Sequence, residues 1–301
     1  MFINTTNISR KKALLELKKQ KSKEEKLNMK LDIDFKTIWP KLNNDTISKV
    51  INDSTLNITV ATLSLYRYNL LIRSLEYNPN MTSIPLNICL RVQAAEEMSV
   101  EHKKKVIDLL EKNYKAYDLQ FTYRNHGSGV PRHDVVHRAL NHFGSKFVMT
   151  LDDDILMPKY GIEILASILL DNPNFGAVGL GYEPAPIVWK EKGNRLRPST
   201  PDKGLHEVDA IGSGTTITRR EVFEKCDLDI NYYIGWGDMD FCKQMKVAGW
   251  KIAMLYLPNL KASNAKNKMS TDMKYYNIRY NAKHTKNSWN RYLQKWGIKI
   301  G

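Results

Sequence analysis

The sequence FVMTLDDDILMP, residues 147–158, joins a short apolar run to three consecutive aspartates. Phe147–Leu151 is typical of a buried strand, and Asp152, Asp153 and Asp154 follow it directly. Three adjacent carboxylates repel one another, so a buried site holds them only with a compensating positive charge. This stretch alone is compatible with a metal site and with a solvated acidic turn.

Strand patterns alternate with helix patterns on both sides of this stretch. The expected strands are Leu56–Leu65, Pro85–Val92, Leu119–Arg124 and Phe147–Leu151, and the expected helices are Tyr68–Asn78, Ser99–Tyr114, a segment that ends at Gly144, and Tyr160–Pro173. This alternation predicts an α/β fold with a doubly wound, mostly parallel sheet and helices on both faces. Ligands of such sheets bind beyond the carboxyl ends of the strands, where the three aspartates lie. The order of elements therefore favours a functional site.

The second half of the chain is less regular. Residues 174–184 and 206–226 are typical of strands with glycine turns. Asp238–Ala248 is typical of an amphipathic helix, and a further strand is expected after Gly249.

The composition is that of an ordinary globular protein, with 42% hydrophobic and 26% charged residues among 301. No apolar run reaches the roughly 18 residues of a membrane-spanning helix, and the N-terminus lacks the apolar region of a secretory signal. Cys89, Cys226 and Cys242 are widely spaced, which indicates a reducing compartment without a disulfide framework. We therefore expect a cytoplasmic protein.

The net charge of +14 is concentrated at the two ends of the chain. Residues 10–30 hold nine Lys or Arg against three Glu, and Ser9–Leu27 is typical of a solvated helix. Residues 259–301 hold ten Lys or Arg against one Asp, interleaved with aromatic residues. Both ends suit an anionic partner, either a nucleic acid or an anionic membrane surface at which the protein is peripheral. The last segment also fits a C-terminal helix with its aromatic side chains in the core.

Five segments between residues 56 and 258 carry recognisable motifs. They are YRYN (66–69), NHGSGVPRHDVVHRAL (125–140), LDDDI (151–155), GSGTTITRREVF (212–223) and GWGDMDFCKQMKVAGWKI (235–252). In this order they resemble the GT-A glycosyltransferases, and most of all family 2 and its relatives. A lone D-x-D motif is a weak signal, but the W-G-D-x-D-F and A-G-W patterns that follow it make the combination specific. The sequence departs from the family pattern at His133, where Asn is usual, and at Gly237, where Glu is usual.

The resemblance implies a nucleotide-sugar donor, for which we expect a UDP-sugar, and a divalent cation, Mn²⁺ or Mg²⁺. Asp154 would ligate the metal directly, and Asp152 would contact the metal or the ribose; carboxylate oxygens suit both cations. The family often has a further histidine ligand after the final strand, and here His284 comes later and could replace it. The donor contacts implied by the resemblance are Thr62, Arg67, Arg132, His133, Asp152 and Asp153.

On the acceptor side the resemblance implies that Asp238 is a general base, so that one displacement inverts the anomeric configuration. Trp236 would offer a flat face to a sugar, and Gly214 and Asp240 would complete the acceptor contacts. Asp238 and Asp240 also suit the first turn of a helix without any catalytic role.

A glycan of a surface polymer is the expected acceptor. Modified DNA or another polyanion, held by the basic tail, is the alternative acceptor. A non-catalytic nucleic-acid-binding protein is a different alternative, which the nearly neutral middle of the chain disfavours. The expected parts are a basic helical extension (1–50), a GT-A catalytic domain (51–258) with a nucleotide-sugar-binding half (51–157) and an acceptor-side half (158–258), and a basic aromatic extension (259–301).

The sequence HDVVH, residues 133–137, places two imidazoles one helical turn apart. It resembles the zinc-binding H-E-x-x-H motif of metalloproteases, with Asp134 in place of Glu. Aspartate is shorter than glutamate, and no third ligand follows at a recognised distance. We favour one packed and one exposed histidine over a zinc hydrolase. In a third interpretation Arg132 and His133 contact the donor, since a guanidinium pairs well with phosphate.

Overall fold

The computed structural model describes residues 41–53, 55–181, 188–192, 195–258, 260, 262–264, 273–297 and 299–300. The chain divides into two compact units, Met1–Asn44 and Asp45–Gly301. The basic segment 10–30 and the helix expected at Ser9–Leu27 lie outside the described residues, nearly all of which belong to the second unit. None of the described helices is long and apolar enough to cross a membrane.

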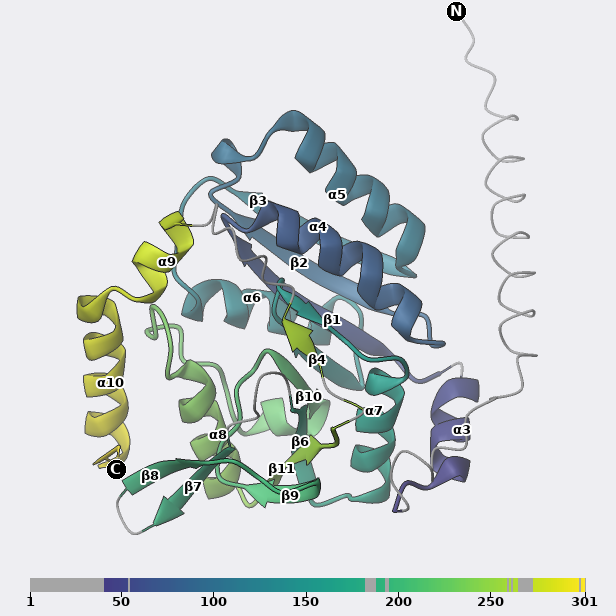
Figure 1. The fold of residues 1–301 in the computed structure, drawn as a ribbon, viewed down its shortest axis with the longest axis vertical. Coiled ribbons are helices and arrows are strands. Elements are labelled where there is room, and N and C mark those ends of the chain that lie inside the picture. Colours follow the sequence, from purple (N-terminus) through teal and green to yellow (C-terminus); the bar gives the residue numbers. More distant parts are fainter. Residues whose placement is uncertain are drawn as a thin grey trace, which may run out of the picture. The chain divides into compact units, whose positions relative to one another are not determined.

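An eight-stranded mixed sheet forms the centre of this unit, in the order β3-β2-β1-β4-β10-β6-β11-β9 (Figure 1). The first four strands in this order are mutually parallel, and β6 and β11 are parallel to each other. The predicted α/β fold with a mostly parallel sheet is confirmed. The strands are β1 (Ile58–Leu65), β2 (Asn87–Gln93), β3 (Ala116–Thr122), β4 (Phe147–Leu151), β6 (Phe175–Leu180), β9 (Gly204–Val208), β10 (Thr215–Arg219) and β11 (Lys251–Tyr256).

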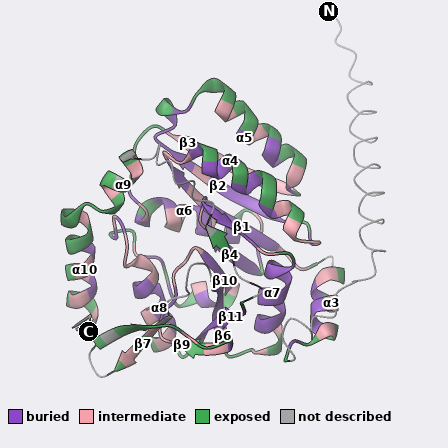
Figure 2. Ribbon diagram, in the orientation of Figure 1, coloured by how far each residue is buried: buried purple, intermediate pink, exposed green. Residues whose placement is uncertain are grey.

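Helices cover both faces of the sheet. Nearly every residue of β1 is buried, which requires cover on both faces because successive side chains point to opposite sides. Helices α4 and α6 both pack on β1, α7 packs on β6 and β10, and α8 packs on β11. Figure 2 shows the central strands buried and the outer sides of α5 and α10 exposed. The helices of this part are α3 (Asn44–Asn52), α4 (Tyr68–Tyr77), α5 (Val100–Asn113), α6 (Gly129–Asn141), α7 (Gly161–Asp171) and α8 (Gly237–Val247).

The N-terminal half follows the sequence prediction closely. The strand Phe147–Leu151 has the predicted bounds, and the Ser99 side chain caps α5 by accepting the His102 backbone N–H at 3.1 Å. Strand β3 begins three residues before the predicted start at Leu119, because its pairing with β2 starts at Ala116. Short 3₁₀ helices, η1 (Asn78–Met81), η2 (Ala95–Glu97) and η3 (Arg220–Glu224), complete the connections.

The second half contains features that the sequence did not predict. The region predicted as strands with glycine turns contains β9 and β10, and both run antiparallel to their neighbours in the sheet. A hairpin of β7 (Val188–Lys192) and β8 (Arg195–Ser199) stands outside the main sheet, and β13 (Lys299–Ile300) pairs with β8. A two-stranded ribbon joins β5 (Ile155–Leu156) to β12 (Ser263–Asn264).

The described part of the tail folds onto the α/β core. It contains α9 (Met273–Arg279) and α10 (Ala282–Trp296). Tyr292 is 1% exposed, and Trp289 and Trp296 pack against the same hydrophobic cluster. Tyr292 therefore lies in the core and the partly buried Trp289 and Trp296 pack against it, in line with the alternative interpretation of this segment.

Candidate active site

The carboxyl end of β4 and the start of β10 form the centre of the candidate site. Leu151 pairs with Thr215, so the residues after β4 meet those before β10. The Asp152 N–H donates to the Gly214 carbonyl at 3.1 Å. A Cβ atom on Gly214 would lie 2.9 Å from Oδ2 of Asp152, so a larger residue there would push this carboxylate out of its position. The structure thus brings two of the predicted site residues into contact.

A cleft of about 250 Å³ opens at this edge of the sheet. It is lined by residues that follow β1 and β4, by the loops before β10 and α8, by the first turns of α6 and α8, and by the tail. The lining residues that carry charge or a phenol are Arg67, Arg132, Asp152, Asp154, Asp229, Tyr232, Asp238, Tyr275, Arg279 and Tyr280. Of the predicted site residues, the cleft is therefore lined by Arg67, Arg132, Asp152, Asp154, Gly214 and Asp238.

Two arginines compensate the charge of the three aspartates. Arg67 forms ion pairs with Asp153 and with Asp154, the latter at 2.7 Å from Nη1 to Oδ2. Arg132 donates to Asp152 at 3.1 Å and to the Ser213 hydroxyl at 2.6 Å. The acidic triplet is therefore a paired, largely buried cluster and not a solvated turn.

Burial and these arginines act in opposite directions on the three carboxyl groups. Asp153 is fully buried, and burial raises its pKa to about 7 against the opposing effect of Arg67. Burial also disfavours the charged form of Asp152, but Arg132 and Arg67 hold its pKa below the usual value. Asp152 is thus available as an anion in the cleft, whereas Asp153 lies beneath it.

The backbone around Arg67 and Asp238 has unusual geometry. Tyr66, which precedes Arg67, has φ of 62°, and Trp236 has φ of 65°. Left-handed conformations are uncommon for residues with a bulky side chain and cluster at functional sites. The Arg67 guanidinium is further fixed by the Tyr275 ring, whose centroid lies 4.0 Å from Cζ.

Asp238 lies in the first turn of α8 and lines the cleft. Its Oδ1 accepts the N–H of Met239 at 2.9 Å. A Cβ atom built on Gly212 would lie 3.8 Å from its Oδ2, which places this oxygen beside the loop before β10. The carboxylate therefore has the helix-start position that its sequence suggested and is also accessible from the cleft.

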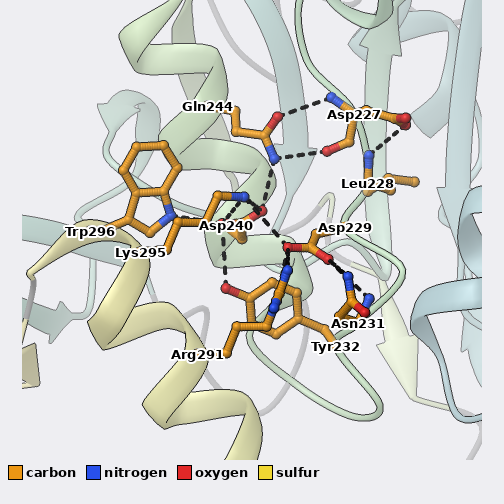
Figure 3. A network of polar contacts seen from close by, with 10 residues as sticks. All are labelled: Asp227, Leu228, Asp229, Asn231, Tyr232, Asp240, Gln244, Arg291, Lys295 and Trp296. Carbon is orange, nitrogen blue, oxygen red and sulfur yellow. Dashed lines mark hydrogen bonds and ion pairs between the residues drawn. The ribbon is translucent and has the colours of Figure 1, made fainter.

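Asp240 is a structural anchor for α10 (Figure 3). Its carboxylate is fully buried and accepts from Trp296 Nε1 at 2.7 Å, Gln244 Nε2 at 2.8 Å and Lys295 Nζ at 2.9 Å. All of these donors belong to the protein itself, and Asp240 does not line the cleft. We therefore do not include Asp240 among the proposed acceptor contacts.

We expect Asp240→Asn to lower the free energy of unfolding by about 2–3 kcal/mol, because it leaves buried donors of α8 and α10 without a charged acceptor. Urea unfolding measures this loss. Asp238→Asn is the matched control, since it changes a cleft-facing carboxylate of the same helix and should shift stability by less than about 0.5 kcal/mol. Equal losses in the two variants would contradict the anchoring role of Asp240.

Four further predicted residues, Trp236, Thr62, His133 and His284, are not part of the cleft lining. Trp236 packs its ring 4.9 Å from that of Trp289 and 5.6 Å from that of Tyr292, so its predicted sugar-facing role is lost to packing on α10. Thr62 is buried within β1. His133 contacts Asp227, not the aspartate triplet, and the ring of His284 lies 4.3 Å from that of Tyr233. The structure therefore does not bring His133 and Trp236 to the cleft, and their expected contacts with donor and acceptor stay predictions.

The first turn of α6 is held tightly against the loop before α8. The Ser128 N–H donates to the Tyr233 carbonyl at 2.6 Å. Gly127 has φ of +71°, and a Cβ atom there would lie 2.3 Å from the same carbonyl oxygen. This close approach positions Arg132 opposite the loop that leads to Asp238.

Gly127→Ala should therefore lower the free energy of unfolding by about 2–4 kcal/mol, from left-handed strain and from overpacking. Gly144→Ala separates the two causes, because Gly144 has φ of +60° and nothing within 4 Å of its Cβ position. The control should lose only about 1 kcal/mol. If both variants unfold at the same urea concentration, overpacking against the Tyr233 carbonyl does not add to the cost at Gly127, and the close approach seen in the structure is contradicted.

The tail supplies cleft residues that the motifs did not reveal. Tyr275 and Arg279 come from α9, and Tyr280 follows it. Their sequence shows only a basic aromatic pattern, and more than 100 residues separate them from the aspartates. No spacing rule links such distant segments.

The donor set of the cleft fits a hard divalent cation. Asp152 and Asp154 both line it and offer carboxylate oxygens, which Mg²⁺ and Mn²⁺ prefer. Arg67 pairs with Oδ2 of Asp154, and a carboxylate has a second oxygen for a metal. A Mg²⁺ ion that is also bound by substrate phosphates typically has one or two carboxylate ligands from the protein.

No protein-family model matches the sequence. No curated protein sequence is similar to it. Among solved structures, the mannosyltransferase PcManGT from Pyrobaculum calidifontis, in complex with GDP-Man and Mn²⁺, is similar with a TM-score of 0.54, at 15% identity over 92% of this chain and 71% of that chain. S. aureus TarS 1-349 is similar with TM-scores of 0.46 in complex with UDP-GlcNAc and 0.48 in complex with UDP, at 14% and 12% identity over 71% and 74% of this chain. The chain spans about three fifths of those TarS chains, which are covered to 60% and 63%.

The likeness to PcManGT defines the class of fold. The sheet and helices are those of the GT-A glycosyltransferase structures, as the sequence motifs predicted. At these identities the likeness concerns the fold.

Proposed function

We propose that this chain is a metal-dependent glycosyltransferase that moves a sugar from a nucleotide-sugar, in the first place a UDP-sugar, to an acceptor with inversion at the anomeric carbon. The observation that carries the proposal is a cleft that is lined together by guanidinium groups, by the carboxylates after β4 and by Asp238. This combination suits a diphosphate, its cation and an attacking hydroxyl group. The fold likeness to a mannosyltransferase structure that holds GDP-Man and Mn²⁺ supports the class of reaction.

The diphosphate of the donor would bind among three arginines. Arg67, Arg132 and Arg279 line the same cleft. Guanidinium groups pair with phosphate oxygens through two parallel N–H groups. Ser128 and Gly129 place the first turn of α6 at the same cleft, and a helix start favours negative charge. These groups bind the donor and stabilise negative charge on the departing diphosphate.

Asp154 and Asp152 would hold Mn²⁺ or Mg²⁺ against this diphosphate. When bound, the cation acts as a Lewis acid that neutralises charge on the leaving group. Burial of Asp153 beneath the cleft leaves it to fix the position of Arg67. The role of Asp153 would thus be indirect.

Asp238 would take the proton of the acceptor hydroxyl as that oxygen attacks the anomeric carbon. The carboxylate lines the same cleft as the aspartates, and an inverting reaction needs a base on the face of the sugar away from the departing diphosphate. Its bond with the Met239 N–H fixes the orientation of the carboxylate.

A glycan is the acceptor that the cleft supports best. Tyr280 is 70% exposed and lines the cleft, so its ring offers a flat apolar face to a sugar. The nucleic-acid alternative drew on aromatic residues of the tail, but Trp289, Tyr292 and Trp296 pack on the core. Basic groups of the tail remain as contacts for an anionic glycan, and such contacts should weaken as salt rises.

The donor assignment is tested by thermal unfolding with UDP, GDP, dTDP and CMP, each with Mn²⁺ and with chelator. One nucleotide, expected to be UDP, should raise the midpoint only when Mn²⁺ is present, since a ligand that binds the native state stabilises it by mass action. No shift with any nucleotide would contradict donor binding in this cleft.

A further inference from the structure

Two histidines of α6 share one carboxylate on the loop before α8. The Nε2 atom of His137 lies 2.8 Å from Oδ1 of Asp227, and Nε2 of His133 lies 3.2 Å from Oδ2. The two imidazole rings have centroids 4.1 Å apart. Both histidines are about one-third exposed, so the expectation of one packed and one exposed histidine is wrong.

These three residues have the composition and spacing of a metal site. Their ligand atoms all lie within 4.8 Å of one another, and among the described residues no other group of three His, Cys, Asp or Glu side chains does so. Ligands at about 2.0–2.1 Å from a tetrahedral zinc ion are separated by roughly 3.3 Å. The distances from Asp227 to the two histidines, 2.8 and 3.2 Å, are slightly shorter than this value, so small side-chain rotations that separate the ligand atoms would admit an ion.

We propose that His133, His137 and Asp227 bind a divalent transition-metal ion of the zinc class, at a site separate from the cleft. Ions of the zinc class bind to two neutral imidazoles and one carboxylate more readily than Mg²⁺ or Ca²⁺, which prefer oxygen ligands. None of the three residues lines the cleft that contains Asp154. The histidines line an open hollow on the outer side of α6, which leaves a further coordination position to water.

The carboxylate of this site is held by a hydrogen-bond network (Figure 3). The Asp227 N–H donates to Gln244 Oε1 at 3.0 Å, and Gln244 Nε2 donates to the Asp227 carbonyl at 2.8 Å. The Leu228 N–H donates to Oδ1 of Asp227 at 2.7 Å. Gln244 also donates to Asp240, which anchors α10. Such outer contacts fix a ligand in position before the metal arrives.

A hydrolase based on HDVVH is not supported. Asp134 occupies the position of the general base in the protease motif, but it pairs with Arg91 at 3.1 Å and with Arg138 at 3.3 Å. Because its carboxylate is paired with two arginines, Asp134 is not free to act as a general base. The same ion pairs neutralise positive charge of Arg91 and Arg138 beside the hollow. The metal would instead connect α6, which carries Arg132, to the loop that leads to Asp238. The site would thus hold together two elements of the cleft.

The test is zinc binding to the full chain without an affinity tag, by equilibrium dialysis and by thermal unfolding. Asp154→Asn serves as the background, because it weakens metal binding in the cleft. We expect one equivalent of Zn²⁺ and a higher midpoint with Zn²⁺ than with chelator. His137→Ala and Asp227→Asn should each lower the zinc affinity more than about tenfold and remove the shift. Co²⁺ should give the visible absorption of a tetrahedral site in the Asp154→Asn background. His137→Ala and Asp227→Asn should each remove this absorption.

His142→Ala is the matched control, because His142 lies at the end of the same helix and its ring packs edge-on against Phe143. It should keep both the equivalent of zinc and the shift of the midpoint. Asp227→Asn retains the backbone bonds to Gln244, so it provides the test if His137→Ala fails to fold. Absence of stoichiometric zinc in the background chain, or full binding in Asp227→Asn, would overturn the proposal.

Discussion

Asp154→Asn should lower turnover of the nucleotide-sugar by about a thousandfold or more. The substitution removes the carboxylate that would hold the cation, and a divalent ion with its fixed ligands stabilises several kcal/mol of developing charge. It also removes one of the two ion pairs of Arg67, which then pairs with Asp153 alone. Both effects act on the leaving diphosphate. The measurement is nucleotide release from the donor at saturating Mn²⁺.

Asp108→Asn is the control for this variant, since Asp108 is an exposed carboxylate on α5 that does not line the cleft. It should keep wild-type turnover. Thermal unfolding without metal shows whether Asp154→Asn is folded. Turnover within about tenfold of wild type in a folded Asp154→Asn protein would contradict the metal-ligand role.

The second large effect is expected at Asp238. Asp238→Asn should keep Mn²⁺-dependent donor binding and lose transfer to the acceptor by about 10²–10⁴-fold, which is the usual contribution of a general base. An amide cannot accept the proton of the attacking hydroxyl group, whereas the proposed donor contacts through Arg67 and Arg132 would be unchanged. Donor affinity by calorimetry and transfer to acceptor, measured on the same sample, separate the two properties.

The assignment of Asp238 as the base requires that transfer is lost while donor binding is kept. Asp108→Asn again supplies a carboxylate-to-amide change that should alter neither property. If Asp238→Asn loses donor binding and transfer in parallel, Asp238 is a donor-site residue and not the base. If it retains transfer close to wild type, its place at the start of α8 is purely structural.

The fold was predictable where local patterns decide it. Alternation of strands and helices gave the parallel half of the sheet, and the strand before the three aspartates has the predicted bounds. The direction of β10 was not predictable, because antiparallel insertion between β4 and β6 depends on pairing with residues far along the chain. The hairpin of β7 and β8 had a local signal, Gly193-Asn194 between two strand-like runs, which is typical of a two-residue turn.

The candidate site was predictable only in part, for a similar reason. Arg67, Arg132 and the aspartates follow strands of one parallel sheet, so their meeting at one edge follows from the topology. Asp227, which meets His133 and His137, lies 90 residues beyond the second histidine, and no spacing rule finds it. Trp236 was assigned from its motif position, but packing on α10 decided where its ring lies.

The central claim is tested most directly by nucleotide release from a panel of UDP-, GDP-, dTDP- and CMP-sugars. The purified chain and Asp154→Asn are each incubated with Mn²⁺ or Mg²⁺ and with chelator. The account predicts that one donor, a UDP-sugar first of all, is slowly hydrolysed by the wild-type chain, and that chelator and Asp154→Asn each abolish this release. Release that is unaffected by chelator and by Asp154→Asn, or no release from any donor, would contradict a metal-dependent glycosyltransferase.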